Sequence, residues 1–77
     1  MIFPYDKESE QCLWMKDMLF SVDIIWVGAD KQVTSIKPNL SPDTYPDSFC
    51  AQAQYVIELP AGEASKSNLR IGQKLNF

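Results

Sequence analysis

No histidine occurs among the 77 residues of the chain. Histidine is the commonest general base near neutral pH and the commonest side-chain ligand of transition metals. Its absence excludes Ser-His and Cys-His nucleophile pairs, and with them most hydrolase mechanisms. A zinc site would have to use cysteines and carboxylates alone, and the two cysteines are far apart in the sequence. We therefore expect no metal site and no cofactor.

Glycine and basic residues are also scarce. The three glycines lack the Gly-x-Gly-x-x-Gly or Walker spacing that cradles phosphates, so no nucleotide site is expected. The seven Lys and Arg residues are scattered singly and the formal net charge is −3, which argues against nucleic-acid binding. The longest apolar stretch, residues 18–29, is shorter than the roughly 20 residues that span a bilayer. Neither nucleic acid nor a membrane is an expected partner.

Only two cysteines are present, Cys12 and Cys50, and they do not form a Cys-x-x-Cys motif. Two buried free thiols and one disulfide both fit this pattern. The first residues lack the basic segment, apolar segment and cleavage site of a signal peptide, so the default location is cytoplasmic. Because intracellular proteins rarely keep disulfides, free thiols are the favoured interpretation.

The composition is that of one small folded domain over residues 1–77, with 45% hydrophobic residues and an acidic balance of charge. Residues 22–27 form a β-branched and aromatic run whose only polar member is Asp23, which predicts a central strand covered on both faces. Turn-forming residues 28–32 and a strand at 33–37 predict a hairpin.

Three prolines punctuate residues 38–50 and predict one long surface loop there. The following strand is expected at residues 54–59, with Tyr55, Ile57 and Leu59 on its core face.

Residues 61–68 suit a short helix that Asn68 can terminate, and residues 74–77 alternate as a last strand would. The expected fold is therefore α+β but mainly β, a small curved sheet or partial barrel of about five strands with one short helix.

Four segments carry a family signature, namely Trp14-Met15-Lys16, Val22-Asp23-Ile24-Ile25-Trp26, Tyr55-Val56-Ile57-Glu58-Leu59-Pro60-Ala61-Gly62 and Ile71-Gly72. Together they resemble the prokaryotic domain-of-unknown-function family 192 over essentially the whole chain. The resemblance implies a mainly β fold and assigns no activity. Asp17, Met18, Ser21 and Gln73 stand where the family usually has Asn, Thr, Pro and Asp, which argues against an activity that depends on the motif.

In the family, an opening strand precedes the segment that Met1-Ile2-Phe3 resembles, so the resemblance implies a truncated member. Loss of a strand exposes a sheet edge whose free N–H and C=O groups recruit another strand. We therefore expect a homodimer that forms through an exposed strand edge.

Three carboxylates, Asp17, Asp23 and Glu58, would converge if the strands that carry them were neighbours, and such clusters can divide acid and base roles. For Asp23 a structural role is favoured, in which the carboxylate accepts backbone N–H bonds or pairs with Lys16.

The favoured function is a non-enzymatic interaction or small-ligand-binding module. Its pocket would be lined by polar groups and an aromatic side chain. The candidate ligand-binding residues are Trp14, Lys16, Asp17, Asp23 and Glu58. One alternative is a small enzyme that uses Lys16 with these carboxylates, acting on a carbohydrate. Another is a decayed fragment without an independent role.

Overall fold

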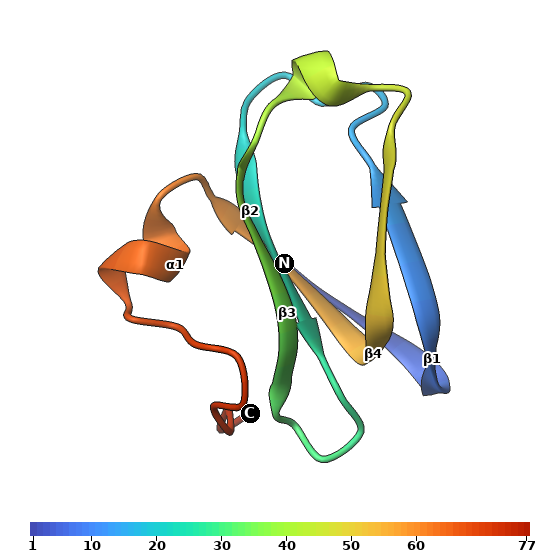
Figure 1. Cartoon of the computed structure of the whole chain (residues 1–77), viewed down its shortest axis with the longest axis vertical. Coiled ribbons are helices and arrows are strands. Elements are labelled where there is room, and N and C mark those ends of the chain that lie inside the picture. Colours follow the sequence, from blue (N-terminus) through green and yellow to red (C-terminus); the bar gives the residue numbers. More distant parts are fainter.

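The computed structural model describes residues 1–77 and contains one antiparallel sheet of four strands in the order β1-β4-β2-β3 (Figure 1). The elements in chain order are β1 (Ile2–Trp14), β2 (Val22–Val27), β3 (Val33–Leu40), the 3-10 turn η1 (Pro42–Thr44), β4 (Ser48–Pro60) and the helix α1 (Glu63–Lys66). The mainly β class is confirmed. The expected number of about five strands is wrong, because residues 74–77 contribute only an isolated bridge between Gln32 and Lys74.

The expected central strand is confirmed as β2. It pairs with β3 on one side and β4 on the other, and all six of its residues are buried. The hairpin to β3 also forms, with Val27 opposite Val33. A strand with both edges paired and both faces covered has no polar outer face, which explains its almost continuous apolar sequence.

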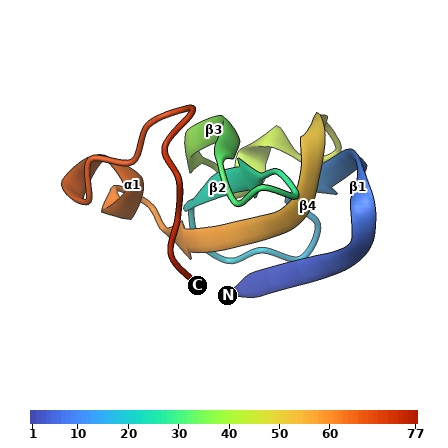
Figure 2. The same ribbon diagram turned by 90° about the horizontal axis from the view of Figure 1, so that it is seen from below.

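Each face of the sheet has its own core. Figure 2 shows how β1 and β4 curl at one end of the sheet. The core of one face packs around Trp26, and Leu13 of β1 and Phe49 of β4 pack against it. Its other buried members are Met15, Val22, Ile24, Leu40, Ala53 and Val56. The opposite face carries Ile25, Val27 and Val33, which pack with Ala64 of α1.

Strand β4 has two covered faces, where the sequence predicted one. Tyr55, Ile57 and Leu59 do share a face and pack on the α1 side, as expected. Val56, however, points to the opposite face and is fully buried against the Trp26 core.

The predicted loop over residues 38–50 is wrong. Strand β3 continues through Pro38 to Leu40, and β4 begins at Ser48, so the connection covers only residues 41–47. Pro38 is tolerated because β3 is an edge strand, where a missing N–H donor leaves no neighbour unpaired. An extra residue between Lys37 and Leu40 makes a β-bulge opposite β2, and Asn39 takes a positive φ of 50° there.

The helix is shorter than the expected 61–68 and covers Glu63–Lys66. Gly62 precedes it with φ 94°, a conformation that favours glycine. Asn68 ends the segment as expected, with φ 56° and with the Leu69 N–H donating to the Ala64 carbonyl.

The structure contains no helix with the length and apolar character that a membrane crossing requires.

Cys12 and Cys50 form a disulfide, which corrects the interpretation as buried free thiols. The two residues are directly opposite each other in the β1–β4 ladder, and both are exposed. The register joins residues 38 positions apart, so neither sequence spacing nor local pattern reveals the pair.

Replacing both cysteines with serine should lower the free energy of unfolding by about 3–4 kcal/mol, because the bridge restricts a long loop of the unfolded chain. Urea unfolding followed by tryptophan fluorescence measures the change. The wild-type chain in excess reductant is the matched control and should unfold at the same urea concentration as the variant. Equal midpoints for the oxidised wild type and the variant would contradict the expectation.

Candidate functional site

Asp23 carries the only charged side chain that is buried in the structure. Its side chain is fully buried in β2. Oδ1 accepts a hydrogen bond from the backbone N–H of Asn39 at 2.8 Å. Oδ2 accepts two more, from Gly62 at 3.0 Å and from Ala64 at 2.8 Å. The three donors belong to the β3 bulge and to the β4–α1 junction, so one side chain joins three segments.

Two opposing effects set the pKa of Asp23. Burial raises the pKa because it disfavours the charged form, but the hydrogen bonds from Asn39, Ala64 and Gly62 stabilise the carboxylate and lower it. The donors prevail, and the pKa lies below the usual value of 3.8. Asp23 is therefore a carboxylate at neutral pH.

Of the two structural roles expected for Asp23, the acceptance of backbone N–H bonds is confirmed. The hydrogen bonds described above all come from the backbone. The ammonium group of Lys16, the other expected partner, instead lies over the ring of Trp14, 5.7 Å from its centroid.

Asp23 and Glu58 project from opposite faces of the sheet. In the β2–β4 ladder Asp23 is paired with Leu59, and Glu58 is paired with Ile24. Paired residues share a face and successive residues alternate, so the two carboxylates are on different sides. Asp17 is exposed in the turn after β1, with a positive φ of 61°.

Trp14 is on the surface, apart from both Asp23 and Glu58. Its ring is half-exposed and packs on Tyr45 at a centroid distance of 5.1 Å, with Lys16 alongside. Trp26 is separate from this group, because its indole is buried and its Nε1–H donates to the carbonyl of Gln11 at 3.0 Å. The five candidate residues are thus divided among several places and do not line one pocket.

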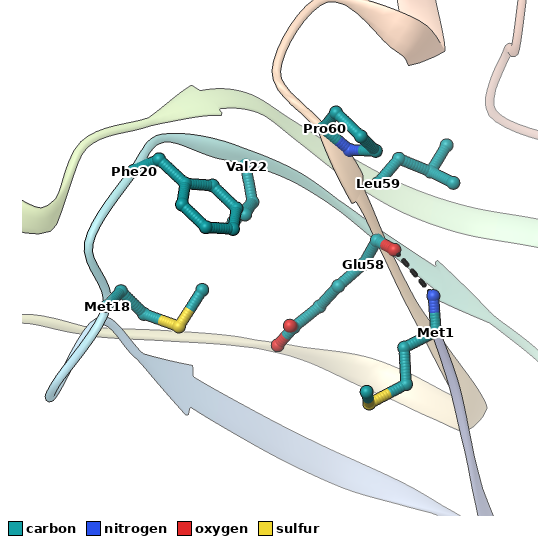
Figure 3. A pocket seen from close by; sticks show the side chains of 7 residues that line it. All are labelled: Met1, Met18, Phe20, Val22, Glu58, Leu59 and Pro60. Carbon is teal, nitrogen blue, oxygen red and sulfur yellow. Dashed lines mark hydrogen bonds between the residues drawn. The ribbon is translucent and has the colours of Figure 1, made fainter.

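Glu58 alone among the candidates lines the pocket of the structure, which has a volume of about 510 Å³. Figure 3 shows its side chain extending between Met18 and Met1. The full lining is Met1, Met18, Phe20, Val22, Glu58, Leu59 and Pro60. The amino group of Met1 donates to the backbone carbonyl of Glu58 at 2.9 Å, which fixes the beginning of β1 beside this wall.

Sequence reasoning identified Glu58 but missed the apolar lining. The signal was the run Met18-Leu19-Phe20, which is outside any strand and whose last two residues are 90% and 63% exposed. Large apolar side chains that remain at the surface next to a concavity indicate a binding surface.

The family model DUF192, with the description "Uncharacterized ACR, COG1430", matches residues 1–77, which confirms the resemblance. No curated protein matches the chain.

Two solved structures are similar to the chain, each with a TM-score of 0.91. One is a "putative transcription regulator" from Sinorhizobium meliloti 1021, 23% identical, and the match covers 99% of this chain and 60% of that one. The other is a protein of unknown function from Novosphingobium aromaticivorans DSM 12444, 28% identical, with coverages of 100% and 56%. The chain therefore spans less than two thirds of the length of either protein.

Substitution of Asp23 with Asn should lower the free energy of unfolding at neutral pH by about 2–4 kcal/mol. An amide offers one acceptor oxygen, and its NH₂ group would face a backbone N–H in place of the second oxygen. Urea unfolding followed by circular dichroism measures the loss. Asp17→Asn is the matched control, because it removes the same charge from an exposed turn and should leave the unfolding midpoint unchanged.

The same variant should change the acid dependence of stability. Because the folded-state pKa is lower than the usual value of 3.8, the stabilisation from Asp23 is complete above that value and is lost as pH falls through the folded-state pKa. Asp23→Asn should therefore lose less stability than the wild type on acidification. Parallel slopes of unfolding free energy against pH would contradict this account.

Proposed function

Since the chain belongs to the DUF192 family, described only as uncharacterised, we propose from its pocket that it is a non-enzymatic module that binds a small, largely apolar cation. The observation that carries the proposal is the pocket of about 510 Å³, whose lining side chains are apolar except for the carboxylate of Glu58. The amino group of Met1, the other charged group at this wall, is held by the backbone carbonyl of Glu58. Small-molecule sites have this combination of size, apolar walls and few polar groups.

The lining has the chemistry that such a ligand requires. Met1 and Met18 provide flexible thioether side chains that adapt to different apolar shapes. Phe20 offers an aromatic face that attracts a cation, and Glu58 offers the opposite charge. The formal net charge of −3 also favours a positively charged ligand over an anion.

The placement of the carboxylates favours binding over the alternative of a carboxylate enzyme. A glycosidase needs two carboxyl groups that flank one bond of the substrate. Asp23 is buried on the other face of the sheet from Glu58, and its oxygens accept three backbone hydrogen bonds. Glu58 therefore has no such partner in Asp23, and a binding role fits its isolation.

Titration of the ¹⁵N-labelled chain with decylamine, decanol and decanoate, followed by NMR, tests the proposal. The amine should bind tightest, by up to about fivefold over the alcohol, and the carboxylate weakest, since a partly exposed ion pair contributes about 1 kcal/mol or less. The shifted amides should include Val22 and Leu59. Glu58→Gln should abolish the preference for amine over alcohol, whereas Asp47→Asn, which removes an exposed loop carboxylate, should preserve it. Binding that is absent, or a preference that survives Glu58→Gln, would refute the proposal.

We also propose that two copies pair through β1. This strand of 13 residues is at the edge of the sheet, beyond β4. The other edge strand, β3, is partly covered, because Val33 exchanges backbone hydrogen bonds with Gly72 and Gln73, and Lys31 accepts one from Leu75. The longer and more open edge is therefore the one that supports strand addition.

Light scattering after size exclusion should give twice the chain mass of 8.8 kDa at high concentration and a lower mass on dilution. Ile2→Lys should weaken the association, because a charged lysine on an edge strand opposes pairing. Ile71→Lys is the control, because it makes the same change from isoleucine to lysine at an exposed position outside β1. It should not weaken the association. A chain that is monomeric at every concentration would rule out the dimer.

A further inference from the structure

One outer face of the β1–β4 ladder brings two cysteines and a carboxylate together. Cys12 is directly opposite Cys50, and Glu10 is opposite Gln52 in the same register. Because Glu10 and Cys12 are two positions apart in one strand, their side chains project from the same face. The Sγ atoms of Cys12 and Cys50 and a carboxylate oxygen of Glu10 all lie within 4.8 Å of one another, and all three residues are exposed.

We propose that reduction of the Cys12–Cys50 disulfide converts this cluster into a site for a soft divalent cation, with Zn²⁺ as the expected ion. Two thiolates and one carboxylate are ligands that Zn²⁺ accepts, and water completes the tetrahedral set. The two sulfur ligands favour Zn²⁺ over Mg²⁺ or Ca²⁺, which prefer oxygen.

The two states are alternatives with a defined chemistry. A dithiol reductant attacks the S–S bond, which breaks and receives two electrons and two protons, so that Cys12 and Cys50 become thiols and the reductant becomes a disulfide. Zn²⁺ then displaces the two thiol protons and binds both thiolates and Glu10. A two-electron oxidant reverses the sequence, reforms the S–S bond and releases the ion.

The surrounding backbone keeps the ligands close when the disulfide is open. The strand pairing continues on both sides of the cluster, from Ser9 opposite Ala53 to Trp14 opposite Ser48. The carbonyl of Gln11, between Glu10 and Cys12, also accepts the indole hydrogen bond of buried Trp26 at 3.0 Å. The geometry of the site therefore depends on the ladder and the core as well as on the disulfide.

This cluster is independent of the pocket beside Glu58, because the two have no residue in common. Glu58→Gln therefore leaves the proposed metal ligands unchanged, and Glu10→Gln leaves the pocket lining unchanged.

Titration of the reduced chain with Co²⁺, followed by displacement with Zn²⁺, tests the proposal. Tetrahedral thiolate ligation should give visible ligand-field and ultraviolet charge-transfer absorption at one Co²⁺ per chain, and Zn²⁺ should remove both. The oxidised chain should give neither signal. Glu10→Gln should weaken the affinity of the reduced chain by at least about tenfold, and Asp47→Asn should leave it unchanged.

Circular dichroism shows whether the reduced chain is folded, so the metal-binding test can be interpreted in either case. If reduction unfolds the chain, Zn²⁺ should restore the β-sheet spectrum, and Cys12→Ser/Cys50→Ser should not respond. A reduced wild type that binds Co²⁺ no more tightly than the double serine variant would overturn the proposal. Unchanged affinity in Glu10→Gln would overturn it too, because the carboxylate would then not be a ligand.

Discussion

The buried carboxylate of Asp23 is the constraint on which the architecture depends. A charge removed from water is unfavourable unless hydrogen-bond donors replace the solvent, and here three backbone N–H groups do so. Their positions require the bulge that places Asn39 beside β2 and the left-handed Gly62 that turns the chain after β4. The turn also brings Ala64 onto the core, so the helix side of the sheet is organised around one side chain.

Local patterns predicted the elements whose residues carry one consistent signal. The apolar run of β2, the turn after it and the terminating Asn68 are of this kind, and all three are as expected. The extent of β1 could not be read in the same way, because its middle is polar and its partner is the distant β4. The prediction that the strand ends at Pro38 was wrong for a related reason, because only the sheet order shows that β3 is an edge strand.

The candidate site was predictable in its members more than in its arrangement. Asp23 and Glu58 stand out because each is a polar residue in an apolar strand. Whether they meet depends on which residue of β2 faces which residue of β4, and a shift of one position would exchange the faces. The pocket lining was hidden for another reason, because Met1, Phe20 and Leu59 come from three segments that only the folded sheet brings together.

The pairing of the first strand with the fourth has a consequence for how the chain is made. Residues at the beginning of β1 pair with residues near the end of β4, as Ile2 does with Ile57. Two of the hydrogen-bond donors to Asp23 are 39 and 41 residues further along the chain. Contacts of such long range give slow folding. During synthesis, residues 48–60 must therefore leave the ribosome before β1 has its partner strand, and β1 is exposed to chaperones and proteases until then.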